Sequence, residues 1–310
     1  MFGLSLYFEN QVEAAFPRLE APIGKRITVA GTELHLADHP ADPDADLLPM
    51  LFIHGASGNL RDLQAPLAEK LEGRGRMIFV DRPGHGYSER GDGEDMQMPW
   101  SQAELLAKLL DELDIDKVIV VGHSLGGSTA AAFAVNHPEK VAGLVFLAPA
   151  THPWPNRDLS WHYDVANFPV VGGAFSQLFA VPFGQLLYED GVRSVFKPQP
   201  IPEDYIETAD TKLILRRANF QYNAEDVGAL YDAVAEIALR YPEIKVPTSI
   251  LTGDQDDVVL ADIHSKGLEQ DIKGSKLVWL KGEGHMPAWT NPDTVIREIE
   301  RVSAEAKLAN

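Results

Sequence analysis

Short apolar runs alternate with longer amphipathic segments along most of this chain, and this alternation constrains the fold more than any other feature. The run Val118-Ile119-Val120-Val121 has no polar residue, as expected of a strand that helices cover on both faces. Parallel strands need long crossover connections, which amphipathic helices usually supply. The pattern therefore predicts an α/β fold, with a mostly parallel sheet between two layers of helices.

Eight segments have the length and apolar content of strands: residues 26–30, 33–37, 50–54, 77–81, 118–122, 141–147, 249–252 and 276–280. The first two alternate polar and apolar residues, which indicates an antiparallel edge of the sheet. Composition and helical spacing of apolar residues predict helices over residues 60–72, 101–113, 124–136, 260–270 and 294–306. We therefore expect an eight-stranded sheet.

The strand rhythm stops between residues 151 and 245, where proline and aromatic residues become frequent. Segments 205–222 and 226–240 have the pattern of helices. This stretch is interpreted as a helical insertion in a regular α/β body. The expected organisation is an N-terminal arm (1–24), a core (25–150 and 246–310) and the insertion (151–245).

The charge balance narrows the range of partners. The chain has 27 Lys and Arg against 46 Asp and Glu, a net charge of −19, and no basic run longer than a pair. Such a negative field opposes binding to nucleic acid or to an anionic membrane, so neither is expected. The absence of cysteine excludes disulfides, thiolate metal sites and a cysteine nucleophile.

The N-terminal apolar stretch from Phe2 to Phe8 is too short to span a bilayer, and no basic segment precedes it. It is interpreted as an ordinary helix or arm, the alternative being the residual part of a lost anchor. With no visible signal peptide, a cytoplasmic location is expected.

The strongest chemical signal is Gly122-His123-Ser124-Leu125-Gly126-Gly127, which lies between a buried strand and a helix. This is a G-x-S-x-G nucleophile elbow in the strand–turn–helix context that it requires. The turn is so sharp that side chains two residues either side of the serine would collide, hence the two glycines. The motif predicts that the Ser124 hydroxyl projects from the sheet at the start of a helix.

A serine hydroxyl needs a base to take its proton and an acid to orient that base. His285 follows the last strand and lies in the glycine-rich segment Gly282-Glu283-Gly284-His285. The loop after the preceding strand offers three carboxylates: Asp254, Asp256 and Asp257.

The order Ser124, Asp256, His285 resembles the α/β-hydrolase fold family, in which serine, acid and histidine follow one another along the chain. The family places the acid three positions after the strand-ending glycine, which selects Asp256 over Asp254 and Asp257. Residues 148–151 hold no alternative acid after the sixth strand. The resemblance covers residues 25 to 308 and implies the α/β-hydrolase fold with a helical cap.

The segment His54-Gly55-Ala56-Ser57-Gly58 is similar to a second landmark of the family. The resemblance implies that the backbone N–H groups of Ala56 and Leu125 form the oxyanion hole, with His54 structural. Residues 81–88 resemble the family's D-x-x-G-x-G-x-S loop, so His85 is expected in a turn, away from catalysis. His123 is expected to be buried beside the elbow.

The insertion corresponds by resemblance to the family's cap, or lid. Its aromatic residues could line an acyl pocket or form the cap's own core: Trp154, Trp161, Phe168, Phe175, Phe179 and Phe183. Trp154 and Trp161 are retained as candidate substrate contacts, together with Met286 and Trp289 just past His285. No metal-ligand motif, calcium loop or phosphate-binding loop is found, so no metal or cofactor is expected.

These residues predict a serine hydrolase that cleaves a carboxylic ester of a small or medium uncharged substrate through an acyl-enzyme. The preference for esters follows from the family resemblance. Amide hydrolysis, carbon–carbon cleavage of a diketone, perhydrolase chemistry and acyl transfer use the same triad and stay open. Family members with an aspartate nucleophile are excluded by Ser124. A receptor that binds a small molecule without turnover is the alternative of another class. Oligomeric state is not predicted.

Overall fold

The computed structural model describes residues 23–93, 95–155 and 189–309. The described chain forms one eight-stranded sheet in the order β1-β2-β4-β3-β5-β6-β7-β8. Its strands are β1 (Lys25–Val29), β2 (Thr32–His39), β3 (Met50–Ile53), β4 (Met77–Val80), β5 (Val118–His123), β6 (Val141–Leu147), β7 (Thr248–Gly253) and β8 (Lys276–Leu280). All eight predicted strands are confirmed, with boundaries that shift by no more than two residues.

The sheet is antiparallel only at the edge formed by β1 and β2. β1 pairs with β2, and β2 with β4, in antiparallel fashion, whereas every later pair is parallel. The carboxyl ends of the parallel strands therefore meet at one edge, and the pairing of Ile53 with Gly122 aligns two of them. The loops with Ala56, Ser124, Asp256 and His285 all leave the sheet there.

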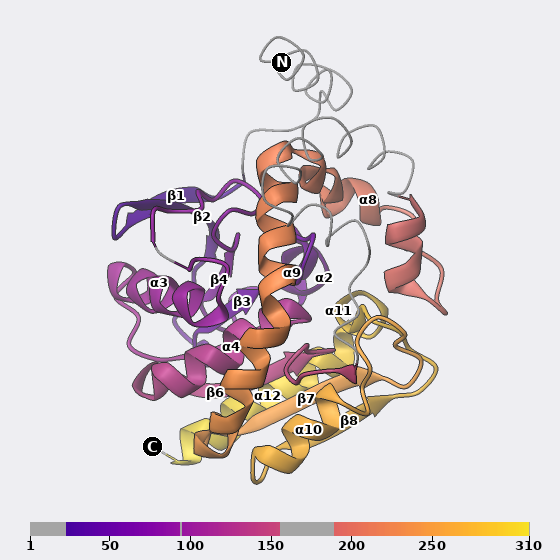
Figure 1. Ribbon diagram of the computed structural model, residues 1–310. Coiled ribbons are helices and arrows are strands. Elements are labelled where there is room, and N and C mark those ends of the chain that lie inside the picture. Colours follow the sequence, from indigo (N-terminus) through magenta and orange to yellow (C-terminus); the bar gives the residue numbers. More distant parts are fainter. Residues whose placement is uncertain (1–22, 94, 156–188, 310) are drawn as a thin grey trace.

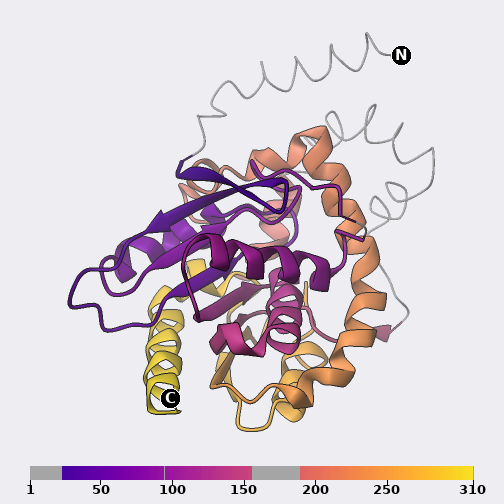
Figure 2. The same ribbon diagram turned by 90° about the vertical axis from the view of Figure 1, so that its left-hand side faces the viewer.

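Helices cover both faces of the sheet, as predicted (Figure 1 and Figure 2). On one face lie α3 (Pro99–Glu112), α4 (Leu125–Asn136) and α10 (His264–Asp271). On the other lie α2 (Arg61–Leu71) and α12 (Pro292–Ala309), near the short helix α11 (Pro287–Thr290). Alternate side chains of one strand serve opposite layers, because Leu51 and Ile53 pack on the first face and Met50 and Phe52 on the second.

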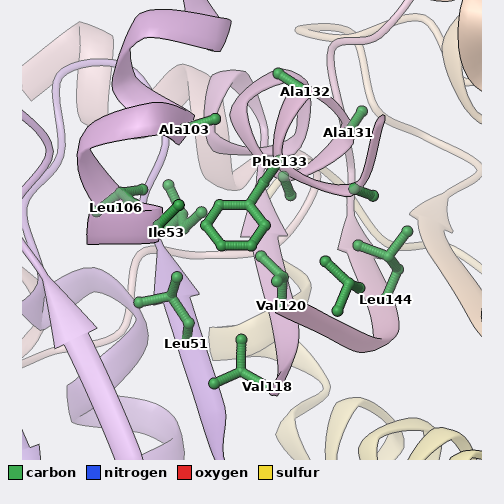
Figure 3. Packing of buried hydrophobic residues seen from close by; sticks show 14 of the residues in the cluster. Leu51, Ile53, Ala103, Leu106, Val118, Val120, Ala131, Ala132, Phe133 and Leu144 are labelled. Carbon is green, nitrogen blue, oxygen red and sulfur yellow. The ribbon is translucent and has the colours of Figure 1, made fainter. Parts of the chain in front are cut away.

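Phe133 of α4 forms the centre of the first layer (Figure 3). Its ring is fully buried and belongs to one cluster with Ile53 of β3, Val120 of β5 and Leu144 of β6. This packing fixes α4 on the central strands, and with it the turn between β5 and α4.

The described part of the insertion is helical, but its helices differ from those predicted. It contains α8 (Tyr205–Thr208), α9 (Arg217–Ile237) and the 3-10 segments η3 (Thr211–Leu215) and η4 (Ala238–Glu243). The prediction of one helix over 205–222 is wrong, because Asp210 adopts a left-handed conformation (φ 47°) that interrupts it. The break predicted before Asp226 is also wrong, since α9 continues without interruption through residues 223–225.

Helix α9 lies on the opposite side of the molecule from α12 (Figure 2). It packs on α4 and reaches the loops at the carboxyl edge of the sheet. None of the described helices combines the length and hydropathy needed to cross a bilayer. Most of the N-terminal arm, residues 1–22, lies outside the described residues.

Candidate active site

The turn between β5 and α4 holds Ser124 in a conformation that non-glycine residues rarely adopt. Its φ and ψ angles are 52° and −122°. The two glycines are required as predicted: a Cβ on Gly122 would lie 2.5 Å from the Gly126 oxygen, and one on Gly126 would lie 2.3 Å from the Ile53 oxygen. The elbow therefore depends on close backbone contacts that exclude any larger side chain.

Ser124, His285 and Asp256 form a continuous chain of hydrogen-bonding distances. His285 Nε2 lies 3.0 Å from Ser124 Oγ, and His285 Nδ1 lies 2.8 Å from Asp256 Oδ2. All three residues are buried, so surrounding water screens their interaction only weakly. The structure thus brings together the three residues that were predicted from separate parts of the chain.

Asp256 is the one of the three candidate carboxylates that contacts His285. Its other oxygen, Oδ1, accepts hydrogen bonds from the backbone N–H groups of Val258 and Val259 at 2.8 and 2.9 Å. Burial by itself would raise the pKa of Asp256, but His285 and these donors together hold it below its usual value. Asp257 is exposed, and Asp254 accepts a hydrogen bond from the Gly282 N–H.

The loop that carries His285 is held from two sides. On one side, Asp254 and Gln255 bond to residues 280–283. On the other, Gln199 of the insertion donates to the Gly282 oxygen and accepts from the Gly284 N–H. These hydrogen bonds hold the loop, and with it His285, in position.

Two backbone N–H groups beside Ser124 have no hydrogen-bond acceptor among the described residues, namely those of Ala56 and Leu125. Leu125 is the first residue of α4, where N–H groups have no acceptor within the helix and the helix dipole is positive. The side chains of both residues pack in one apolar cluster with α9. These are the two donors that the family resemblance implied for the oxyanion hole.

A sequence model of the α/β hydrolase fold matches residues 49–292, which is most of the chain. The chain belongs to the α/β-hydrolase fold family. The matched range contains the elbow, the acid loop and the histidine loop described above.

Relatives of this α/β-hydrolase include a protein named as an esterase or lipase and proteins named as 2-hydroxy-6-oxo-dienedioate hydrolases. A Haemophilus influenzae protein named "Putative esterase/lipase" is 26% identical over 81% of this chain and 82% of its own length. The 2-hydroxy-6-oxononadienedioate/2-hydroxy-6-oxononatrienedioate hydrolase of Escherichia coli (strain SE11) is 26% identical over 89% of this chain and 94% of its own length. The chain is thus a hydrolase of this superfamily.

Solved structures agree on the fold. The esterase EaEST from Exiguobacterium antarcticum superposes with a TM-score of 0.71 at 20% identity, over 92% of this chain and all of that one. The enol-lactonase from Burkholderia xenovorans gives 0.69 at 20% identity, over 91% of this chain and all of that one.

The other histidines at this end of the α/β-hydrolase hold neighbouring loops. His54 donates from Nδ1 to the Gly55 oxygen and accepts at Nε2 from the Arg82 N–H. His85 lies beside Arg82 and the Pro83 oxygen, as expected for a residue in a turn. Burial, followed by the charge of Arg82, holds the pKa of both histidines well below the usual value, so both are neutral.

The candidate substrate contacts lie in two apolar clusters. Trp154 packs with Ala56 and Leu125 in the cluster that includes Val227, Leu230 and Val234 of α9 and Val259. Met286 and Trp289 pack in a different cluster with Phe196 and Tyr205. The Trp289 indole N–H donates to the main-chain oxygen of Asp62. The other named aromatic residues, Trp161, Phe168, Phe175, Phe179 and Phe183, lie outside the described residues.

Sequence reasoning missed a buried polar network between α9 and the loops around Ser124. Arg82 and Asp226 form an ion pair in which both side chains are fully buried. Asn219, Asn223 and Asp226 are all buried on α9. Their spacing of i, i+4 and i+7 was the available signal, because it places three polar residues on one helix face. No three His, Asp or Glu side chains in the described ranges are grouped as a metal ion would require.

Proposed function

We propose that this α/β-hydrolase cleaves carboxylic esters of small or medium uncharged substrates through an acyl-enzyme on Ser124. The observation that carries the proposal is the chain of contacts from Asp256 through His285 to the Ser124 hydroxyl. The two backbone donors beside Ser124 support it, because an ester carbonyl develops negative charge on its oxygen as it is attacked.

In the proposed mechanism, His285 takes the Ser124 proton while Oγ attacks the ester carbonyl. The Ala56 and Leu125 N–H groups stabilise the oxyanion, and Asp256 orients His285 and stabilises its charged form. His285 then protonates the leaving alcohol. In the second half, His285 takes a proton from water, the resulting hydroxide attacks the acyl carbon, and the proton returns to Ser124.

The surroundings of Ser124 favour an uncharged substrate. The side chains that pack around Ala56 and Leu125 are apolar, including Trp154, Val227 and Val259. The net charge of −19 disfavours the approach of an anion. We propose further that residues 151–245 act as the cap over this site, with α9 as its inner wall.

The carbon–carbon alternative has a specific observation in its favour. A 2-hydroxy-6-oxo-dienedioate has no ester or amide bond, so a relative that hydrolyses one must cleave a carbon–carbon bond. Such a substrate carries two carboxylates, and the net charge of −19 disfavours the approach of an anion. We therefore rank this activity second.

The proposal is tested by fluorophosphonate labelling and by turnover of p-nitrophenyl esters of increasing acyl length. Wild type should label and cleave short or medium esters, while Ser124→Ala and His285→Ala should do neither. Labelling without cleavage of any ester, but with turnover of a 2-hydroxy-6-oxo-dienedioate, would transfer the assignment to carbon–carbon hydrolysis. A folded wild type that does not label would point to a binding protein.

A further inference from the structure

The peptide unit between Gly55 and Ala56 lies directly against the nucleophile. A Cβ added to Gly55 would lie only 3.0 Å from the Ser124 Cβ, so a larger residue there would press on the nucleophile. This peptide is trans, since the one cis bond among the described residues precedes Pro198. In a trans peptide the carbonyl and the N–H point in opposite directions. Whatever holds the Gly55 carbonyl therefore aims the Ala56 N–H.

Two side chains donate to the Gly55 carbonyl oxygen. Arg82 Nη2 lies 3.2 Å from it, and His54 Nδ1 lies 2.8 Å from it. His54 is fixed in turn, because its Nε2 accepts the backbone N–H of Arg82. The loop that carries Arg82 thus holds this peptide unit directly through the guanidinium group and indirectly, by way of His54, through the Arg82 N–H.

Arg82 is itself held by the inserted helix. Its Nη1 donates to Asp226 Oδ2 on α9 at 2.6 Å and to Gln102 Oε1 at 3.1 Å. Gln102 also donates to Asp226, and Arg90 Nη2 lies 2.7 Å from the second oxygen of Asp226. Burying such a pair is unfavourable unless the geometry is good, and apolar replacements are often equally stable. Stability alone is thus a weak reason for this ion pair.

Ser57, which follows Ala56 in the chain, is also held by α9. Asn223 accepts a hydrogen bond from the Ser57 N–H at 2.6 Å and donates to Ser57 Oγ at 3.2 Å. Ser57 has a φ of 58°, a conformation that its surroundings must impose. Helix α9 therefore holds the chain on both sides of Ala56. It reaches Gly55 through Arg82, and it contacts Ser57 directly through Asn223.

We infer that Arg82, Asp226 and Asn223 are positioning residues that orient the Ala56 N–H toward the oxyanion, so that helix α9 completes the oxyanion hole. This inference rests on the proposed function. It assigns to the inserted helix a direct effect on transition-state stabilisation, in addition to any role in covering the substrate.

The test compares a p-nitrophenyl ester with its thionoester, in which sulfur replaces the carbonyl oxygen. Sulfur is a weak hydrogen-bond acceptor, so the ratio of the two kcat/KM values reports on the oxyanion hole. Asn223→Ala and the double variant Arg82→Met with Asp226→Leu should lower kcat for the ester by about 10- to 100-fold with little change in KM. The ester-to-thionoester ratio should fall by a similar factor.

Asn219→Ala is the matched control. Asn219 lies one turn before Asn223 on the same face of α9 and is also buried, but its side chain donates to the Gly86 oxygen instead of holding Ser57. Its ratio should equal that of wild type. If the double variant does not fold, Asn223→Ala alone carries the test.

Equal losses on ester and thionoester, or no loss on either, would overturn the inference while wild-type activity still supports the proposed function. A wild type that neither labels nor cleaves esters would instead overturn the proposed function itself. Thermal unfolding of every variant separates these outcomes from a general loss of structure.

Discussion

His123 Nε2 donates a hydrogen bond to the main-chain oxygen of His285 at a distance of 2.9 Å. The residue before the nucleophile thus anchors the loop that carries the base. Burial, followed by the charge of His285, lowers the pKa of His123 to about 3, so its ring is neutral near pH 7. Ser124 and His285 are therefore linked both through their side chains and through this bond.

Replacing His123 with alanine should lower kcat without a comparable change in KM. A typical hydrogen bond contributes about 1 kcal/mol, which corresponds to roughly a five- to tenfold fall in rate. The measurement is steady-state turnover of the best p-nitrophenyl ester. His39→Ala, which removes a histidine from β2 near Gln64, should leave kcat unchanged. An unaltered kcat in His123→Ala would show that the loop is positioned without this bond.

Asp256→Asn should lower kcat by about 10³- to 10⁴-fold, because the amide can hold His285 in the wrong tautomer. The neighbouring exposed residue supplies the control, and Asp257→Asn should stay within about twofold of wild type. Both variants should unfold at similar temperatures. A larger effect at position 257 than at 256 would contradict the assignment of the acid.

Gly126→Ala should destabilise the fold by at least about 2 kcal/mol, since its new Cβ would lie 2.3 Å from a main-chain oxygen that cannot move freely. Gly191 is the contrasting position, because a Cβ there meets no atom of the described residues within 4 Å and the residue is helical. Gly191→Ala should raise stability by roughly 0.5 to 1 kcal/mol. Urea unfolding of the two variants beside wild type gives both values.

Asp62 should make stability fall as the pH rises. Burial raises its pKa to about 6, although the Tyr205 hydroxyl donates to it at 3.0 Å and opposes that shift. The folded state therefore holds this proton more tightly than the unfolded chain, whose value is 3.8. The contribution of Asp62 to the free energy of unfolding is fully present below about pH 4 and is lost as the pH rises past about 6.

Asp62→Asn removes this titration. The free energy of unfolding of Asp62→Asn minus that of wild type should increase from pH 4 to pH 7, by up to about 3 kcal/mol. Urea unfolding across this range measures the difference. A constant difference would mean that the carboxyl group ionises as easily in the folded protein as in the unfolded chain.

The sheet and the tight turn at Ser124 could be predicted because their signals are local. A run such as Val118 to Val121 has the same meaning wherever it occurs, and the glycines beside Ser124 report a turn within five residues. The choice of Asp256 needed the family resemblance, because Asp254 and Asp257 are chemically equivalent to it in the sequence.

The network around Arg82 could not be predicted in the same way. Its members come from separate parts of the sequence, and each is of a type that is usually exposed: Arg82, Gln102 and Asp226. Residues 223–225 were left between two predicted helices, whereas they lie within α9, and Asn223 belongs to its buried face. Polar residues that line one face of a helix have the same spacing whether that face is buried or exposed to water, so the spacing does not tell which it is.

The ion pair between Arg82 and Asp226 also limits how this protein can be recombined with its relatives. Each charge is fully buried and each comes from a different part of the chain, one from the core and one from the inserted helix. A chimera that received a foreign helix without an acid at position 226 would retain an uncompensated guanidinium, at a penalty of about 3 to 5 kcal/mol. The two parts can be exchanged or evolve only together at this point, so the insertion is not an independent module.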